Sequence, residues 1–452
     1  MRTITMDLSN VLAGAVGENG IEENDLRLTL GKLSEYYARL LTKPFPFMML
    51  PSMRFQFNEM NALAERVSKM NIKNLVILGI GGSSLGTQTI FEALLHPFHN
   101  MDERFRNGKP RYFILDNIDP HKMTAVVETV LPDIDRTLLV VISKSGETPE
   151  TISQFMLFNE LMKKADGYRD RIILITDIDK GLLNTIAQKE GYAVLNLPPG
   201  IGGRFSVLTP VGLFPSLLMG INIKKMSDGA AGMAAHIVRY DAEENMAFTL
   251  AAILYLMYKN GKPIHVMMPY CERLAAFANW FRQLEAESLG KKGSGPTPAR
   301  SVGVTDQHSQ LQLYVEGPKD KCILLLYSAT SEAPIPDSFG YLDDVAYLAN
   351  KDMKDLFHAE FQGTRMSLTD AGTPNIALML DEVSDYNIGA LFYLFEMVTA
   401  FMGNLLGVNA FAQPGVEQGK IYTKAMMGKE GFEKEKEKTD NFLCCPVRQI
   451  IF

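Results

Sequence analysis

The sequence predicts an α/β protein built on two mainly parallel sheets that are flanked by helices. Short apolar runs alternate with helical stretches from Leu75 to about Ile221, and a second alternation of the same kind begins at Ile264. The chain has 452 residues, which is too long for one ordinary hydrophobic core. We therefore expect two α/β domains of similar plan, preceded by N-terminal helices and followed by a C-terminal tail.

Eight apolar runs have the length and composition of buried strands. They fall at 75–78, 112–115, 138–142, 172–176, 193–196, 264–268, 322–327 and 376–380. The longest helical stretches are 226–260, which we expect to join the two domains, 273–290 and 387–406. Glu396 and Asn404 interrupt the last of these, so it is not expected to span a membrane.

These patterns divide the chain into four parts. The expected boundaries are 1–70 for a helical segment that packs on the body, 71–222 for the first α/β domain, 223–428 for the second and 429–452 for a tail. The first part of the tail, 429–438, mixes both signs of charge and is expected to be solvated. Residues 441–452 are apolar again and are expected to pack back on the body.

The composition argues against several classes of function. The net charge is −7 and the pI is about 5.6, which disfavours a nucleic-acid or anionic-membrane partner. Four irregularly spaced cysteines form neither a disulfide framework nor a zinc site, and the N-terminus carries no apolar signal region. We expect a reduced, cytoplasmic setting and a small-molecule substrate.

The stretch from Ser143 to Thr151 joins a buried strand to a helix and reads Ser-Lys-Ser-Gly-Glu-Thr-Pro-Glu-Thr. Ligands of open α/β sheets bind at this end of the strands, and free N–H groups at a helix N-terminus favour an anion. The hydroxyls of Ser143, Ser145, Thr148 and Thr151 add donors, which predicts a phosphate cradle. A Ser/Thr-rich helix cap without a ligand is the alternative.

A second polar turn, Gly81-Gly82-Ser83-Ser84, also follows a strand and opens a helix. It lacks the G-x-G-x-x-G order and the lysine of a P-loop, so nucleotide binding is disfavoured. If the turn has a function, we expect its backbone to contact a sugar or a phosphate. The alternative is that the glycines only allow a tight turn from strand to helix.

Arg204 follows a glycine-rich turn in Gly202-Gly-Arg-Phe-Ser206. Its guanidinium is always charged and could stabilise an oxyanion that develops during a reaction. The alternative is an ordinary arginine on the surface of a loop. Gln283 and Glu287 lie four residues apart on one predicted helix and share a face. The apolar neighbours of Glu287 would partly desolvate its carboxylate, which suits a general base.

Two further residues are candidates for proton transfer. His308, in Thr305-Asp-Gln-His308, is one of seven histidines, and Lys420 follows a turn at the start of a helix with Glu417 three residues earlier. An exposed histidine and a surface i, i+3 ion pair are the alternatives. No His, Cys or carboxylate group has the spacing of metal ligands, so we expect no catalytic metal.

Together and in this order, the motifs closely resemble the glucose-6-phosphate isomerase family in its compact bacterial form. The matching segments are 79–86, 143–148, 202–206, 283–288, 305–308 and 413–420. The resemblance covers about residues 70–425 and implies two sugar-isomerase (SIS) domains. It implies reversible interconversion of glucose 6-phosphate and fructose 6-phosphate, in glycolysis and gluconeogenesis, through a cis-enediol without a metal or other cofactor.

The resemblance also implies a role for each candidate residue. Glu287 corresponds to the base that moves the proton between C2 and C1, and Arg204 to the group that stabilises the enediolate. His308 and Lys420 correspond to the residues that open the sugar ring. The implied substrate-binding residues are Gly82, Ser83, Ser143, Lys144, Ser145, Thr148, Thr151, Gln283 and Gln413. In the family the histidine reaches the site from the partner subunit, so a homodimer is implied.

Larger relatives carry Asn where Leu289 stands and usually Asp where Ala412 stands, and these departures suit the shorter bacterial branch. Two alternatives share the SIS domains. A sugar-phosphate-sensing regulator would have no need of Glu287, His308 and Lys420 together, and the chain shows no basic helix-turn-helix. A glucosamine-phosphate synthase would show two Ser-Gly-Glu-Thr loops and an N-terminal Cys, whereas position 2 is Arg2.

Overall fold

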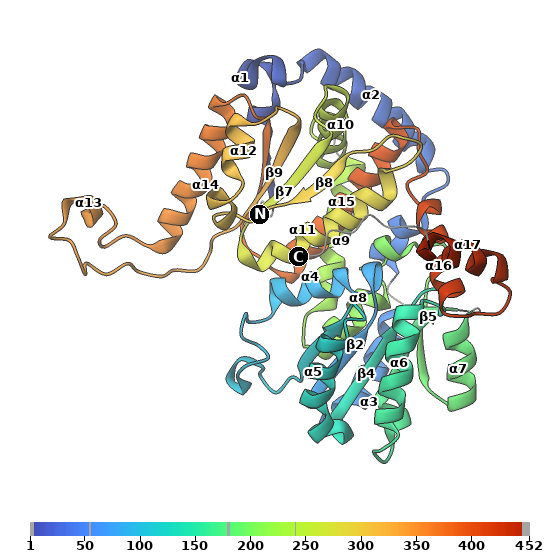
Figure 1. Cartoon of the computed structure of the whole chain (residues 1–452). Helices are drawn as coiled ribbons and strands as arrows, with labels where there is room; N and C mark the ends of the chain where they lie inside the picture. Colours follow the sequence, from blue (N-terminus) through green and yellow to red (C-terminus); the bar gives the residue numbers. More distant parts are fainter. Residues whose placement is uncertain (1–3, 54–55, 179–180, 240, 445–452) are drawn as a thin grey trace.

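The computed structural model describes residues 4–53, 56–178, 181–239 and 241–444, which form two α/β units, each with a five-stranded sheet (Figure 1). All strands of the first sheet are parallel, in the order β3-β2-β4-β5-β6. Their bounds are β2 Asn74–Leu78, β3 Arg111–Leu115, β4 Thr137–Ile142, β5 Ile172–Asp177 and β6 Ala193–Leu197. The five strands predicted in this half of the chain are confirmed.

Helices cover both faces of the first sheet, as a parallel sheet requires. One face packs against α5 Pro120–Val130, α6 Pro149–Met162 and α7 Leu182–Glu190. The other packs against α3 Gln56–Ser68, α4 Leu85–Leu94 and α8 Pro210–Leu218. The core on this second face runs on into the second unit, so the two units share one hydrophobic cluster.

The second sheet has the order β1-β10-β9-β7-β8, and only β1 runs antiparallel to its neighbour. The bounds are β1 Ile4–Asp7, β7 Ile264–Tyr270, β8 Thr297–Arg300, β9 Lys321–Tyr327 and β10 Asn375–Leu380. The predicted strands β7, β9 and β10 are confirmed, whereas β1 and β8 were not predicted. Both unpredicted strands are four-residue edge strands, and neither is fully buried.

The helices of the second unit surround this sheet. They are α1 Ala13–Val16, α2 Glu23–Leu40, α9 Ile223–Arg239, α10 Met246–Lys259, α11 Ala275–Leu289, α12 Leu311–Glu316, α13 Asp343–Ala346, α14 Met353–Asp370 and α15 Asp385–Leu405. The predicted single stretch 226–260 is two helices, because the Asn245 side chain accepts from the backbone N–H of Phe248 and begins α10 afresh. Among the described residues α15 is long and apolar enough to cross a membrane, but 89% of its apolar window is buried inside the protein.

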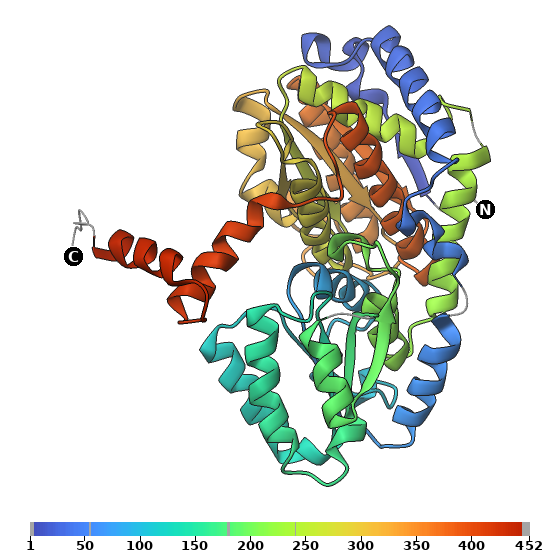
Figure 2. The same cartoon turned by 90° about the vertical axis from the view of Figure 1, so that its right-hand side faces the viewer.

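Two segments project from the body. Residues 329–352, which include α13, form an extended arm beside α14 (Figure 1). The last helices, α16 Glu417–Met426 and α17 Glu433–Cys444, stand out together on another side (Figure 2). Phe442 and Leu443 are 74% and 63% exposed, so the expectation that 441–452 packs on the body is wrong for 441–444. Residues 445–452 lie outside the described residues.

Candidate active site

The loops after β2 and β4 lie side by side because these strands are neighbours in the first sheet. A Cβ on Gly79 would lie 3.2 Å from the carbonyl oxygen of Ile142, the last residue of β4. Ser143 begins the loop that follows β4, and Gly82 and Ser83 lie in the short 3₁₀ turn that follows β2. The two polar turns predicted from the sequence therefore meet at the carboxyl edge of one sheet, where α/β proteins bind ligands.

The loop from Ser143 to Thr151 is held by hydrogen bonds among its own side chains and backbone. Ser143 Oγ and Thr148 Oγ1 are 3.0 Å apart, and the N–H of Glu147 donates to Ser145 Oγ over 3.2 Å. Thr148 is the N-cap residue of α6, yet its side chain makes no capping hydrogen bond. Because its hydroxyl faces Ser143 instead, the alternative of a plain Ser/Thr helix cap does not describe this turn.

The backbone of this loop is anchored to the end of β5. The carbonyl oxygen of Lys144 accepts from the N–H of Asp177 at 3.3 Å and from the Thr176 hydroxyl at 3.4 Å. Gly146 has φ +66°, and a Cβ there would lie 2.9 Å from the backbone nitrogen of Leu183. Thr151 is buried in the first turn of α6. The loop is thus fixed in place before any ligand arrives.

The turn after β2 reaches across to the second unit. Gly81 has φ +61°, and a Cβ there would lie 2.7 Å from Gln283 Nε2 on α11. A Cβ on Gly82 would overlap the carbonyl group of Gly203, in the turn that carries Arg204. These close approaches leave no space for a side chain, so the glycines bring the first sheet's edge against the residues around Arg204 and Gln283.

Arg204 is buried, with 2% of its surface exposed, and its guanidinium ties several segments together. Nε donates to Ser288 Oγ at 2.7 Å, and Nη2 donates to the carbonyl oxygens of Ala410 at 2.5 Å and Ala412 at 3.1 Å. Nη1 donates to Gln413 Oε1. Burial lowers the pKa of Arg204, and nearby Glu287 opposes that shift. The surface position considered for this arginine is wrong.

The Glu287 carboxylate lies between two donors. Its Oε2 is 3.4 Å from Arg204 Nη1, and its Oε1 accepts from Gln283 Nε2 at 3.1 Å. The side chain is 29% exposed, so solvent or a ligand can reach it. Among the described residues Gln283 Oε1 is buried and has no hydrogen-bond partner. The Glu287 carboxylate can take up a proton from a ligand. The buried Arg204 guanidinium beside it can stabilise the negative charge that this proton transfer leaves on the ligand.

A cavity of about 590 Å³ opens beside Glu287. Gln413, at the start of the turn before α16, lines it together with Lys291, which sequence reasoning missed. Lys291 Nζ donates to the carbonyl oxygens of Glu287 at 2.7 Å and Ser288 at 2.5 Å. Burial, with a contribution from Arg204, lowers the pKa of Lys291 to about 8. Its position four residues after Glu287 is the signal that could have revealed it.

The loop from Ser143 to Thr151 borders a different cavity, of about 450 Å³, which Glu147, Pro149 and residues of α6 and α16 line. Val416 lines the cavity of Glu287, and α16 begins at the next residue. The segment that carries Gln413 and α16 therefore borders both cavities.

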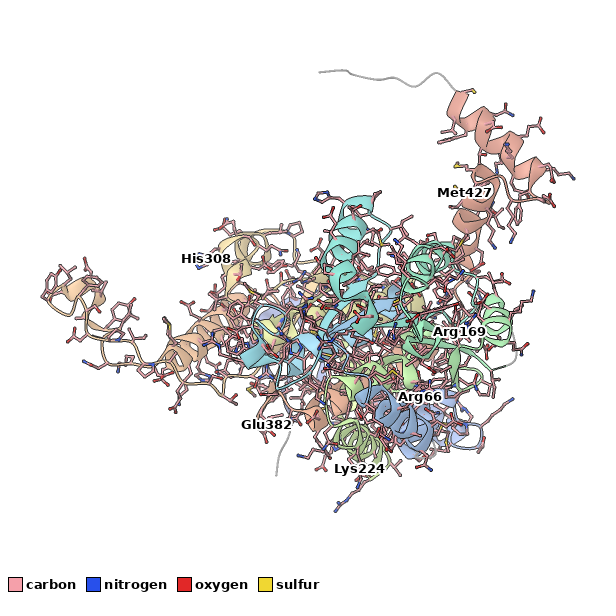
Figure 3. The ribbon with its side chains drawn as sticks, turned by 90° about the horizontal axis from the view of Figure 1, so that it is seen from below. Arg66, Arg169, Lys224, His308, Glu382 and Met427 are labelled. Carbon is pink, nitrogen blue, oxygen red and sulfur yellow. The ribbon has the colours of Figure 1, made fainter. Side chains whose placement is uncertain are left out.

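Two predicted residues lie outside this cluster. Lys420 is exposed on projecting α16 and pairs with Glu417 at 2.8 Å, which is the surface pair that the sequence offered as the alternative. His308 is exposed in a 3₁₀ turn after β8 and points outward at the edge of the molecule (Figure 3). No group of three or more His, Cys, Asp or Glu residues within the described part of the chain is arranged to hold a metal.

Two mainly parallel sheets that are flanked by helices define the class of fold seen in phosphosugar isomerases. The structure of tagatose-6-phosphate ketose/aldose isomerase from Escherichia coli shares the fold, with a TM-score of 0.50 and 15% identity over 81% of this chain and 92% of that one. The predicted SIS architecture is confirmed.

Closer relatives define the family. The sequence model of the phosphoglucose isomerase family matches residues 54–308 and 349–442. Glucose-6-phosphate isomerase of Rubrobacter xylanophilus is 39% identical over 96% of this chain and its own full length, and that of Carboxydothermus hydrogenoformans is 40% identical over 82% of each. The structure of a hypothetical protein from Thermus thermophilus has a TM-score of 0.83 at 32% identity, over 94% of this chain and 100% of that one. The chain is an enzyme that belongs to the phosphoglucose isomerase family.

Proposed function

We propose that the protein interconverts glucose 6-phosphate and fructose 6-phosphate through a cis-enediol, with Glu287 as the base. The observation that carries this proposal is the Glu287 carboxylate, held between Arg204 and Gln283 at the edge of a cavity. Curated relatives at about 40% identity bear the name of this activity. The reaction serves glycolysis and gluconeogenesis.

The proton balance of the reaction needs one base on one face of the substrate. In the open-chain aldose, Glu287 takes the proton from C2, and the electron pair moves onto the carbonyl oxygen at C1. The resulting enediolate lies beside the Arg204 guanidinium, whose position is already fixed by Ser288 and two carbonyl oxygens. The hydroxyl proton on O2 then passes to O1, which leaves the negative charge on O2. Return of the proton from Glu287 to C1 forms the carbonyl group at C2, which gives the ketose and restores the carboxylate.

The phosphate group of the substrate belongs in the loop from Ser143 to Thr151. Three kinds of donor meet there: hydroxyl groups, backbone N–H groups and the N-terminus of α6. Binding at this distance from C1 and C2 orients the reacting carbons without touching them. Gln413 and the turn at Gly82 and Ser83 would contact the sugar between the two ends.

We further propose that the enzyme is a homodimer in which His308 completes the site of the partner. The turn of His308 shares a cavity with Glu272 and Ala275, at the N-terminal end of α11. Glu287 is 12 residues further along that helix, a separation of roughly 18 Å. Within one chain, His308 is therefore too far from Glu287 to act on the same sugar ring.

The projecting arm gives a second reason to expect a partner. Its tip exposes large apolar side chains: Phe339 60%, Tyr341 79%, Leu342 48% and Tyr347 68%. Such a cluster on an extended segment is typical of a surface that another chain covers. The family match omits 309–348, so this support for a dimer comes from the structure alone.

The variant Glu287→Gln tests the proposal. It keeps the size of the side chain and removes the base, so turnover should fall by about 10²–10⁴-fold in an assay that couples glucose 6-phosphate formation to its oxidation. Fructose 6-phosphate should still bind, but its C1 hydrogen should no longer exchange with deuterium from solvent. Glu160→Gln, at an exposed ion pair on α6, is the matched control. Unchanged turnover in Glu287→Gln, or activity lost to a chelator, would contradict the mechanism.

A further inference from the structure

A separate cavity, of about 690 Å³, lies where the loop after α4 meets the residues that precede α11 and α15. Its lining is strongly basic. The ionisable residues that line it are His96, His99, Arg104, Arg106, Lys109, Arg273 and Asp385. Asp385 is the one carboxylate among the described residues of this lining. In a chain whose net charge is −7, such a concentration of cations needs an explanation. We call it the basic cavity.

Three of the cationic side chains form no close ion pair within the described residues, although the Asp102 carboxylate, whose pKa is lowered by its hydrogen bonds to Arg104, also attracts Arg106, which lowers that pKa further. Within the described residues, no carboxylate oxygen lies within 4 Å of a charged nitrogen of Arg106, Lys109 or Arg273. Arg104 is already paired with Asp102 at 2.5 Å, and Asp385 Oδ1 accepts from the backbone N–H of Asn222 at 3.1 Å. Three unpaired cations around one cavity repel one another, and an anion between them would relieve that repulsion.

The basic residues are held in place by specific packing. The His96 ring stacks on Phe105, with centroids 3.8 Å apart and planes 10° from parallel. Gly220 has φ +83°, and a Cβ there would lie 2.8 Å from Cε of Lys109, so the lysine side chain lies directly on the glycine backbone. His99 Nε2 contacts the carbonyl oxygen of Pro110 at 3.0 Å. His96, His99 and Lys109 thus make specific contacts in the cavity wall, although Arg104 and Lys109 are exposed to solvent.

The start of α15 adds a further positive element. Ser384 is its N-cap, and both Ser384 and Asp385 line the basic cavity. The N-terminal end of this 21-residue helix carries a partial positive charge that attracts anions. Glu382, which stands just before α15, lies at the outer edge of the molecule, far from Met427 on the α16 side (Figure 3).

The basic cavity and the active site lie at opposite ends of the same two helices. At the active-site end, Gly81 precedes α4 and approaches Gln283 of α11; further along, Thr89 Oγ1 donates to the carbonyl oxygen of Ala276 at 3.1 Å. The helices are therefore antiparallel, and Arg273 is 14 residues, roughly 20 Å along α11, from Glu287. A ligand in the basic cavity cannot be the sugar phosphate that reacts at Glu287.

We infer that the basic cavity is a second anion-binding site, which takes a compact ligand with two or more phosphoryl charges. Arg106 and Lys109 reach it from the loop that follows α4, and Arg273 reaches it from the second unit. One doubly charged phosphoryl group would offset two of these three positive charges, and two linked groups would offset all three, which would hold the two units together at this point. A single uncharged sugar or an apolar ligand would leave them unpaired.

The test is calorimetric titration of the full-length protein with pyrophosphate at constant ionic strength. The background carries Ser143→Ala and Thr148→Ala, which weakens the phosphate loop and isolates the second site. In that background pyrophosphate should still bind. Arg106→Ala and Arg273→Ala should each weaken its binding by about tenfold or more, because each removes charged hydrogen bonds to the anion. Thermal melts report whether each variant remains folded, and Arg106→Lys, which keeps the charge, should retain most of the affinity.

The control is Arg169→Ala, which removes one positive charge from a different face, where Arg169 lies 3.8 Å from Glu190 (Figure 3). Its affinity for pyrophosphate should stay within about twofold of the background, as expected for a distant, screened charge. Absence of pyrophosphate binding in the background protein would overturn the inference. So would folded Arg106→Ala and Arg273→Ala variants that bind as tightly as the Arg169→Ala control. None of these variants alters Glu287, so the outcome is independent of the proposed isomerase mechanism.

Discussion

The residues assigned to proton transfer and those assigned to ring opening have opposite surroundings. Arg204 is buried and Glu287 is held against it by Gln283, so this group is assembled within one chain before substrate binds. His308 and Lys420 are exposed and lie outside that group. Under the proposed roles, the residues for isomerisation are assembled within one chain, whereas the residues for ring opening would need a second copy of the chain and a different position of α16 to reach them.

Mixing two inactive variants is the strongest test of whether His308 acts in the site of the partner subunit. His308→Ala and Glu287→Gln should each lose about 10²–10⁴-fold in turnover as separate proteins. If His308 serves the partner's site, unfolding and refolding the two together should restore about a quarter of wild-type activity, because half of the dimers are mixed and each mixed dimer has one intact site. Activity that stays at the level of the separate variants would place His308 with its own Glu287. Mixing each variant with itself is the control.

The variant Arg204→Lys tests the group of Arg204, Glu287 and Gln283, which is assembled within one chain. A lysine keeps one charge but cannot donate at once to Ser288, Ala410 and Gln413, so kcat should fall by about 10²–10³-fold. The melting temperature should fall too, because Ala410 and Ala412 lose a buried donor. Arg282→Lys, at an exposed position on α11, should leave both quantities unchanged. Normal kcat in the Arg204→Lys variant would show that the guanidinium does not stabilise the enediolate.

Thr148→Ala should have a smaller effect. It removes one hydroxyl donor from the phosphate loop, and kcat/KM for fructose 6-phosphate should fall by about tenfold. The slow isomerisation of unphosphorylated fructose should not change, because that substrate has no phosphate to bind. Ser153→Ala, whose hydroxyl bonds only to the carbonyl of Glu150 on the same helix, is the matched control. Equal losses on both substrates would reject the phosphate role of this loop.

The smallest expected effect concerns pH. The pKa of Lys291 is about 8, because burial disfavours its charged form. Below pH 8 the lysine is protonated and attracts the dianionic substrate, and above pH 8 that attraction is lost, so kcat/KM should fall by about two- to fivefold through this pH. Lys291→Arg should abolish the decline, because arginine stays charged. Lys292→Arg should keep it, and a decline that persists in Lys291→Arg would assign it to another group.

Much of the fold follows from local pattern. Runs such as 138–142 and 322–327 are uniformly apolar because parallel strands are buried on both faces, so their prediction is confirmed. The edge strand β8 contains Pro298 and exposed ends, which removes the signal that identified the others. The break between α9 and α10 depends on the cap at Asn245, a single residue within an otherwise helical pattern.

The site was less accessible to sequence reasoning. No local sequence pattern shows that Arg204, Glu287 and Gln413 are in contact, because their contact depends on the packing of the two units. Only the family resemblance connected them. Local pattern also does not reveal that Arg204 is buried or that Lys291 lines the same cavity.

The buried amide oxygen of Gln283 has a consequence for the selection of substrates. A buried acceptor that has no hydrogen-bond partner among the described residues raises the free energy of the ligand-free enzyme by about 1–3 kcal/mol. A sugar whose hydroxyl reaches this oxygen recovers that energy, and a deoxy sugar of the same shape does not. If Gln283 contacts the substrate as proposed, the enzyme should favour fully hydroxylated sugars over their deoxy analogues before any step of catalysis begins.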